Sequence, residues 1–292
     1  MMNRQAFHTF TLCCRGRLVT FDRPAILGIL NVTEDSFYDG GRYTTPETIV
    51  AQARNLLAQG ADIIDIGAVS SRPGAKLLPP DEEAAKLAPI VRLLRQELGE
   101  EALLSVDTCY SLPAAKAVEA GADIVNDISG GQFDPRMFPT VADLQVPYIL
   151  MHTKGTPATM QNPENTQYDD IIGDLAYYFS QKLDALLRLG VKDIVLDPGF
   201  GFAKTVEQNY ELLDRLGELI GLFPERPMLV ALSNKSMISK RLGGVEAADG
   251  GLNPTEFGTL ALNAIALDRG ASLLRVHTPY PTRIAIEVRT KK

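Results

Sequence analysis

The sequence has no tryptophan, only three cysteines in 292 residues, and no long apolar run. Cysteines this few and this irregularly spaced exclude a disulfide scaffold or a cysteine-rich metal site, and an odd, sparse set is typical of a reducing cytosol. No stretch approaches the ~18 apolar residues of a membrane-spanning helix. The first residues also lack the apolar segment of a secretory signal. We therefore expect a cytoplasmic protein.

Positive charge is also scarce. The chain has 29 Lys and Arg against 36 Asp and Glu, which gives a net charge of −7. Proteins that bind nucleic acid usually present a broad basic surface, so we expect neither nucleic acid nor a membrane as a partner. A small anionic substrate stays compatible with this charge, because a few local cations or a bound metal can hold it.

Short apolar runs alternate with helical patterns along the chain. Runs of this kind predict strands that are buried on both faces, and their alternation with helices predicts a parallel sheet. The expected strands are 25–32, 62–67, 103–108, 123–129, 147–153, 194–199, 228–233 and 272–278, and the expected helices include 46–59, 81–98, 112–120, 171–189, 206–222 and 258–269. An open doubly wound sheet stays possible, but eight units without a visible linker favour a (β/α)8 TIM barrel.

The first 22 residues do not fit this alternation. Two short apolar stretches, 7–12 and 18–21, flank Arg15 and Gly16 and predict a β-hairpin. A hairpin in this place can cover the bottom of the barrel. The expected organisation is one domain, 1–292, with the hairpin in 1–22 and the barrel in 23–292.

Polar side chains occur where seven of the eight predicted strands end. The C-terminal ends of the strands, with the loops that follow, carry the function of parallel barrels. The residues are Asn31, Asp107, Asn126 with Asp127, His152, Asp197, Ser233 to Lys235, and Arg275 with His277. A charged group near a barrel interior is costly unless it is paired, so these strand ends predict one shared polar pocket. Arg275 and His277 are two residues apart, so they share a strand face and can together hold an anion.

Three loops beside these strand ends have the composition of site loops. The segment 31–41 is long and polar, and 70–74 is a compact turn that presents Arg72. We expect these two loops to act as mobile lids over the rim. The third loop, 197–204, contains glycines that allow close approach of the backbone to a ligand. Its Gly-x-Gly lacks the spacing of a nucleotide-binding fingerprint.

Eight segments of the chain together resemble the dihydropteroate synthase family. They are GILNVTEDSFYDGG (28–41), DIIDIGAVSSRPGA (62–75), SVDT (105–108), IVNDISGG (124–131), ILMHTKGTPATMQ (149–161), LDPGFGFAKT (196–205), LVALSNKSMI (229–238) and LRVHT (274–278). The segments follow the family's order and cover the barrel from the first strand to the last. NVTxDSF and MHxxGTP favour this branch of the pterin-binding barrels over the methyltetrahydrofolate methyltransferases.

The resemblance implies a TIM-barrel transferase of folate biosynthesis. It would condense 6-hydroxymethyl-7,8-dihydropterin pyrophosphate with p-aminobenzoate to give 7,8-dihydropteroate and pyrophosphate. The resemblance also implies a sulfonamide target, Mg²⁺ as cofactor, and a homodimer formed through helices late in the barrel. Two alternatives stay open: a non-catalytic pterin-binding paralogue, and a pterin-dependent methyltransferase, which has no need of an Arg-x-His for pyrophosphate.

The resemblance also implies a role for individual residues. The pterin would contact Asp107, Asn126, Met151, Asp197, Phe202 and Lys235. The pyrophosphate would lie by Asn31, Arg275 and His277, and Asn31 would also contact Mg²⁺. The p-aminobenzoate side would include Phe37, Ser71, Arg72, Ser233 and Ser236. The candidate catalytic residues are Arg72, Lys235, Arg275 and His277.

These residue types suit the reaction. A carboxylate such as that of Asp197 accepts two neighbouring N–H donors of the pterin ring. The departing pyrophosphate needs its developing charge stabilised by Mg²⁺, Arg275 and His277. The aniline nitrogen of p-aminobenzoate is already nucleophilic, so the reaction needs no strong base. We assign no protein nucleophile, because neither Cys109 nor any serine has a matched histidine and acid.

The chain departs from the family pattern at five positions. Pro is usual at Glu34, Gly at Ala68 and Ala203, Arg at Asn234, and Asp at Thr278. The changes gather around the loops and the side of the second substrate. We therefore expect weaker or altered binding of p-aminobenzoate and of sulfonamides.

Overall fold

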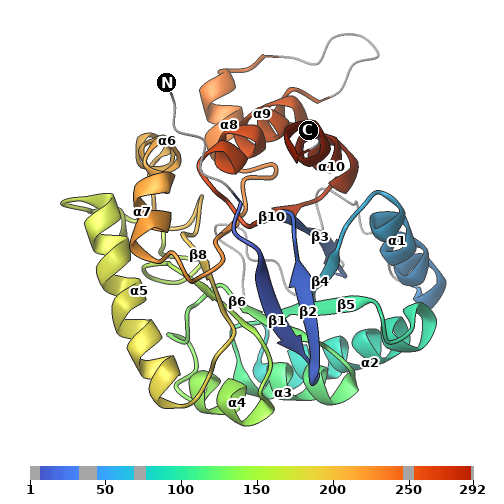
Figure 1. Ribbon diagram of the computed structural model, residues 1–292. Helices are drawn as coiled ribbons and strands as arrows, with labels where there is room; N and C mark the ends of the chain where they lie inside the picture. The colour runs from blue at the N-terminus through green and yellow to red at the C-terminus, as the bar shows by residue number, and fades with distance from the viewer. Residues whose placement is uncertain (1–6, 33–44, 69–76, 246–252, 291–292) are drawn as a thin grey trace.

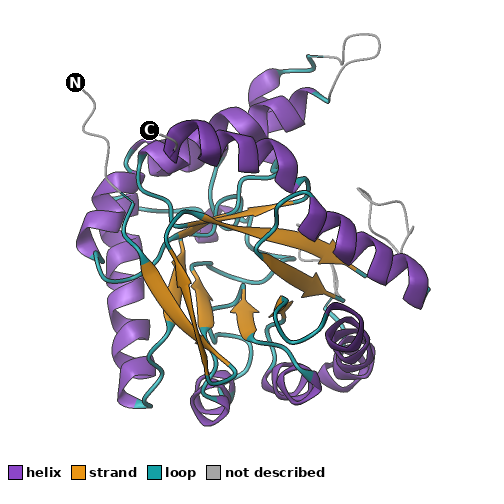
Figure 2. Cartoon of the chain, turned by 45° about the vertical axis from the view of Figure 1, so that its right-hand side comes forward, coloured by secondary structure: helices purple, strands orange, loops and turns teal. Residues whose placement is uncertain are grey.

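Eight strands form one parallel sheet that curves round on itself (Figures 1 and 2). The computed structural model describes residues 7–32, 45–68, 77–245 and 253–290. The strands are β3 (Ala25–Asn31), β4 (Ile63–Gly67), β5 (Leu103–Asp107), β6 (Ile124–Asp127), β7 (Tyr148–Met151), β8 (Ile194–Asp197), β9 (Leu229–Val230) and β10 (Leu273–Val276). Neighbours pair in the order β8-β7-β6-β5-β4-β3-β10-β9.

The two ends of this sheet, β8 and β9, meet at a narrow junction. A single bridge joins Leu196 to Met228, and the backbone N–H of Leu196 donates to the carbonyl oxygen of Pro227 at 2.9 Å. The sheet is therefore a nearly closed barrel, which confirms the predicted TIM barrel and excludes the open sheet. The strand predicted at 228–233 is only two residues long, because its pairing with β8 is reduced to this one bridge.

Helices surround the barrel, as Figure 2 shows in purple. They are α1 (Pro46–Ala58), α2 (Pro80–Leu98), α3 (Ser111–Ala120), α4 (Met137–Leu144), α5 (Ile171–Arg188), α6 (Val206–Asp214), α7 (Leu216–Leu222), α8 (Ser236–Leu242), α9 (Pro254–Asp268) and α10 (Pro279–Thr290), with a short 3₁₀ turn at Pro163–Asn165. Side-chain caps fix several of their starts: Thr45 with Thr48 on α1, and Thr205 with Gln208 on α6, form capping boxes. No helix within the described ranges is long and apolar enough to cross a membrane.

The predicted helix at 206–222 is wrong as a single element. It is divided at Arg215, whose φ of −96° and ψ of 9° lie outside the helical range. Gly217 and Gly221 follow the break. They lower the helix propensity of this stretch, so the packing of the fully buried Leu216 decides the direction of α7. Helices α4, α8 and α10 lie outside the helix ranges named in the prediction.

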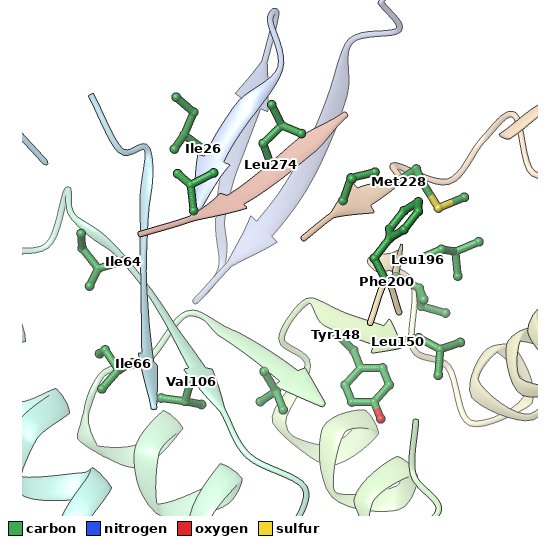
Figure 3. Close-up of a cluster of buried hydrophobic side chains, with 14 of the residues drawn as sticks. Ile26, Ile64, Ile66, Val106, Tyr148, Leu150, Leu196, Phe200, Met228 and Leu274 are labelled. Carbon is green, nitrogen blue, oxygen red and sulfur yellow. The ribbon is translucent and has the colours of Figure 1, made fainter. Parts of the chain in front are cut away.

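Alternate residues on each strand pack into two separate apolar layers. One layer lies between the strands and the helices, and Figure 3 shows part of it, including Ile64 on β4, Val106 on β5 and Leu196 on β8. The other layer fills the barrel interior and contains Ile63, Leu103 and further residues of the opposite parity. A strand residue that is an even number of positions from Ile63 or Leu103 therefore faces the interior.

An antiparallel hairpin of β1 (Phe10–Cys14) and β2 (Arg17–Phe21) precedes the barrel. Its side chains Leu12, Cys14 and Phe21 belong to the interior layer, together with residues near the N-terminal ends of the strands. The hairpin therefore closes the bottom of the barrel, as predicted. Its first strand begins at Phe10, three residues later than expected.

Candidate active site

The pleat of the strands decides which polar strand ends face the interior. Asp107 lies four residues after the interior residue Leu103, and Arg275 lies two residues after Leu273. By the same spacing, Asn126 on β6 and Asp197 on β8 face the interior above the apolar layer. These four residues come from four strands of one barrel, so their side chains lie at the same C-terminal end of its interior.

Arg275 joins two of the carboxylates at this end. Its Nε donates to Asp65 Oδ2 at 2.6 Å, and its Nη2 donates to Asp107 Oδ2 at 2.7 Å. Asp65 also accepts a hydrogen bond from Asn126 Nδ2 at 3.1 Å. The structure therefore brings together three of the predicted residues, Asp107, Asn126 and Arg275, around a fourth group, Asp65.

Asp65 was missed by the sequence analysis because it lies inside a strand rather than at its end. Its side chain is fully buried, and Oδ1 has no hydrogen-bond partner among the described residues. The signal was nonetheless present: a single acid interrupts the apolar stretch Ile63-Ile64-Asp65-Ile66. A buried carboxylate without a partner cation is costly, so such an acid predicts an interior arginine or lysine.

Burial dominates the electrostatics of the pocket. It raises the pKa of Asp107 to about 7, although Arg275 acts in the opposite direction. It raises the pKa of Asp197 to about 6. Burial, and then the charge of Arg275, lowers the pKa of Lys235 to about 8. Ionised and neutral forms of all three groups thus lie close in free energy near neutral pH.

The loop after β8 brings Phe202 to the pocket. The Nζ of Lys235 lies 4.3 Å from the centroid of the Phe202 ring, a cation–π contact. Gly201 makes this approach possible, because a Cβ atom there would lie 3.0 Å from Cδ of Lys235. Earlier in the same loop, the N–H of Gly199 donates to Asp197 Oδ1 at 2.7 Å, and this hydrogen bond holds the carboxylate in place.

Lys204 anchors the same loop from outside the pocket. Its fully buried Nζ donates to the carbonyl oxygens of Gly199 and Phe202, each at 3.1 Å. It also lies 3.1 Å from Nδ1 of His152. Burial lowers the pKa of Lys204 to about 7, and burial followed by the Lys204 charge holds the pKa of His152 well below its usual range.

Two of the predicted strand-end groups do not face the shared pocket. His152 contacts Tyr178 and Phe179 of α5. Asp127 accepts hydrogen bonds from Tyr148 Oη and from Ser129 on the helix side of the sheet. Each follows an interior residue by one position, so the pleat turns it outward. The expectation that every polar strand end converges on one pocket is therefore wrong for these two.

An apolar cluster adjoins the polar groups. It consists of Cys109, Ile128, Met151, Met160, Phe202 and Ala203, with Phe133 packed against it. Met151 and Phe202 were predicted to contact the pterin, whereas Ile128 and Met160 were missed. The pocket therefore combines one apolar wall with carboxylate, amide and ammonium groups, which suits a flat heterocycle with polar edges.

The last strands bring two further predicted residues together. Ser233 Oγ lies 2.9 Å from His277 Nδ1, and the backbone N–H of His277 donates to the same oxygen at 3.2 Å. Ser236 begins α8 directly after Lys235. Asn31 ends β3, where it pairs with Gly67 of β4 at the same rim.

Comparison with known proteins decides the family. A family model described as pterin binding enzyme matches residues 27–277. The dihydropteroate synthase of Synechocystis sp. is 44% identical over 257 residues, which cover 87% of this chain and 85% of that protein. The chain belongs to the dihydropteroate synthase family of pterin binding enzymes.

Solved structures of dihydropteroate synthases agree with this assignment. The Yersinia pestis enzyme in a sulfonamide drug complex has a TM-score of 0.86 and 35% identity, and the match covers 96% of this chain and 98% of that one. The Xanthomonas albilineans enzyme with 4-aminobenzoic acid has a TM-score of 0.82 and 36% identity, with 96% of both chains covered. The transferase function predicted from the eight segments, dihydropteroate synthesis, is confirmed.

Among the residues that depart from the dihydropteroate synthase pattern, two have left-handed backbone conformations. Ala203 has a φ of 49°, and Asn234 has a φ of 56°. Asn is one of the few residues that adopt this conformation readily, so Asn234 suits its backbone better than the usual Arg does. Phe37, Ser71 and Arg72, with the departure at Glu34, lie outside the described residues.

Proposed function

We propose that the chain catalyses its family's reaction, the condensation of 6-hydroxymethyl-7,8-dihydropterin pyrophosphate with p-aminobenzoate, in the pocket at the C-terminal end of the barrel. The observation that carries this proposal is the position of Arg275 between Asp65 and Asp107, beside Asn126. It supports the proposal because a guanidinium, a group that can bind an anion, lies next to carboxylate and amide groups that suit a pterin. A substrate with a pterin ring and an anionic tail matches both halves of this arrangement.

The pterin ring is proposed to lie between the polar groups and the apolar wall. Asp197 would accept two neighbouring N–H donors, and Asp107 and Asn126 would pair with other ring positions. Lys235 would donate to the acceptor edge. A ring without this pattern would leave buried groups unpaired, and the cost of those unpaired groups is the source of specificity.

The pyrophosphate is proposed to lie by Asn31, Arg275 and His277. As the C–O bond to the pterin methylene breaks, negative charge develops on the departing oxygen, and Arg275 and His277 stabilise it. The pterin ring stabilises the positive charge left on the methylene carbon. The aniline nitrogen then forms the new C–N bond and loses its proton, without the need for a strong protein base.

Mg²⁺ is a further part of the proposal, and the donor set at the rim fits it. Within the described residues, no group of three or more His, Cys, Asp and Glu is placed to hold a metal ion. Mg²⁺ is commonly bound through one or two protein oxygens and the phosphates of a substrate, so the amide oxygen of Asn31 suffices as a protein ligand. When bound, the ion would neutralise charge on the pyrophosphate.

The second substrate is proposed to lie above the pterin. Ser236 would meet the carboxylate of p-aminobenzoate together with Phe37, Ser71 and Arg72 from the loops. Sulfonamides, which carry an aniline group, would compete at the same place.

Release of pyrophosphate tests the proposal. The purified enzyme with Mg²⁺ is expected to release pyrophosphate from the pterin substrate rapidly only when p-aminobenzoate is present. Arg275→Lys, which keeps the charge but loses the two-pronged contact, is expected to slow release strongly. A non-catalytic paralogue would bind the pterin substrate without release, and a methyltransferase would not use it; either result would refute the proposal.

We also propose a homodimer, supported by an exposed apolar face on α9 and α10. Phe257 is 53% exposed, Tyr280 59%, and Val288 78%. Isolated exposed apolar residues are common, but several on adjacent helices are typical of an interface. Sedimentation is expected to give a dimer for the parent chain and a monomer for Val288→Glu with Phe257→Glu. A parent chain that sediments as a monomer would contradict the proposed homodimer.

The cytoplasmic location stays a prediction, supported by three free cysteines.

A further inference from the structure

Ser233 and His277 form a hydrogen-bonded pair whose direction depends on the tautomer of His277. Ser233 is buried, with 8% of its surface exposed. Its Oγ accepts the backbone N–H of His277 at 3.2 Å and lies 2.9 Å from Nδ1 of the same imidazole. The sequence resemblance assigned Ser233 to the p-aminobenzoate side, whereas its contacts among the described residues lie on the residue expected to hold the pyrophosphate.

The count of hydrogens decides which atom donates. If Nδ1–H donated to Ser233, the serine oxygen would accept two N–H groups. Its own proton would then have no acceptor, because the described residues offer Oγ no partner beyond these two contacts. If Ser233 donates to Nδ1, its oxygen accepts once and donates once, so both the serine hydroxyl and Nδ1 have a partner. A buried hydroxyl without an acceptor is costly, so the second arrangement is favoured.

We propose that Ser233 is a positioning residue that holds neutral His277 in the tautomer with its proton on Nε2. With Nδ1 occupied as an acceptor, the imidazole presents an N–H donor at Nε2. His277 follows Leu273 and Arg275 at the same two-residue spacing toward the interior. It therefore gives the pyrophosphate a hydrogen-bond donor beside the guanidinium without first gaining a proton.

This inference deepens the proposed function, because the benefit of the donor depends on an anionic leaving group. The tautomer itself can be measured in the free protein, without substrate. The chain has only three histidines, so ¹⁵N labelling of histidine gives few signals, and the variants His8→Gln and His152→Gln assign them. At a pH where His277 is neutral, two-bond ¹H–¹⁵N correlation spectra are expected to show its proton on Nε2. Ser233→Ala is expected to give a mixture of tautomers.

Kinetics supply the second readout. Ser233→Ala is expected to lower kcat/KM for the pterin pyrophosphate about tenfold, the size of one hydrogen bond to a charged group. The KM for p-aminobenzoate should change less than about twofold, since the lost donor serves the other substrate. Ser233→Thr keeps the hydroxyl and is expected to restore both readouts. The additional methyl group has room in a cavity of about 90 Å³ beside Ser233. Ser239→Ala, at an exposed position on α8, is the matched control.

A double variant isolates the mechanism. In His277→Gln the side-chain amide carries N–H groups that need no tautomer, so adding Ser233→Ala is expected to change kcat/KM little further. A free protein with the His277 proton on Nδ1 overturns the proposal. So does a Ser233→Ala variant whose only kinetic change is in the KM for p-aminobenzoate. If the spectra show the expected tautomer but the parent releases no pyrophosphate, the proposed function fails while the positioning by Ser233 stands.

Discussion

The two ends of the barrel use buried charge in opposite ways. At the N-terminal end, Arg95 donates to Asp123 at 2.6 Å and also to three backbone carbonyl oxygens. Asp123 in turn accepts the N–H of Leu104 at the start of β5. Arg283 repeats the arrangement with the carbonyl of Gly60 and the carboxylate of Asp62. Each arginine joins a helix to the start of a strand, Arg95 through all three of its guanidinium nitrogens and Arg283 through Nη2.

At the C-terminal end the groups are only partly paired. Asp65, Asp107 and Asp197 share the interior with Arg275 and Lys235, and burial raises the pKa of two of these carboxyl groups. Such an arrangement costs stability, because buried polar groups without full partners are unfavourable. The comparison shows that the charges at the bottom stabilise the barrel, whereas those at the top are held in place for a ligand.

The largest effect is expected at the bottom, in Arg95→Ala. Removal of one partner of a buried ion pair leaves the other charged and unpaired. The free energy of unfolding in urea should fall by about 3–5 kcal/mol. Arg54→Ala is the matched control: it breaks an exposed pair with Glu97, which should cost less than about 1 kcal/mol. The kcat of folded Arg95→Ala should equal that of the parent. A large loss of kcat would contradict the view that the charges at the N-terminal end serve stability and not activity.

At the top, Asp107→Asn should reduce activity without a loss of stability. Loss of a charged acceptor should lower kcat/KM for the pterin pyrophosphate about tenfold to a hundredfold. Burial raises the pKa of Asp107 to about 7 in the folded state. Its contribution to stability is therefore present below the ordinary Asp pKa and lost as pH rises toward 7. The variant should unfold in urea no earlier than the parent at pH 7, and a clear destabilisation there would contradict the comparison.

The pH dependence of kcat/KM should reflect the titration of groups in the pocket at the C-terminal end of the barrel, and not of those at the N-terminal end. As pH falls below about 7, Asp107 gains a proton, and below about pH 6 Asp197 does so as well, so each loses an acceptor for the pterin; above about pH 8, Lys235 loses its proton. On the acid side and on the alkaline side of the pH profile, the fall in kcat/KM should approach about tenfold per pH unit. Lys235→Arg should move only the alkaline limb to higher pH. An alkaline limb that stays in place in this variant would exclude Lys235 as its origin.

The smallest effect concerns the second substrate. Asn234→Arg restores a cation that is usual in the family and should lower the KM for p-aminobenzoate a few-fold, the size of one exposed charge interaction. Ser239→Arg adds the same charge at an exposed position on α8 and is the control. If Asn234→Arg, alone and with Glu34→Pro, leaves both this KM and sulfonamide inhibition unchanged, the expectation of altered binding fails.

Much of the fold follows from local patterns in the sequence. The apolar runs predict seven strands within a few residues, because each is buried on both faces. The eighth, at 228–233, pairs fully on only one side, and no local pattern reports a missing neighbour. The division of 206–222 at Arg215 depends on how Leu216 packs in three dimensions, so glycine content alone does not locate it.

The sequence predicted many of the residues that belong to the candidate site, but not the contacts that they make with one another. Asp107, Asn126 and Arg275 were expected to converge and do so, while their shared partner Asp65 was overlooked inside its strand. Consistent use of the two-residue alternation would have excluded Asp127 and His152, since each follows an interior residue by one position. The anchoring of the β8–α6 loop by Lys204 depends on backbone carbonyl positions, which no side-chain pattern encodes.

The narrow junction between β8 and β9 has a consequence for how the enzyme holds its substrate. Asp197 lies on one side of this seam, and Lys235 follows the strand on the other side. A pterin that binds both residues therefore links β8 to the segment after β9, across the junction where few backbone hydrogen bonds hold the barrel closed. Amide exchange in the loops after β8 and β9 should accordingly slow more on pterin binding than exchange elsewhere in the barrel.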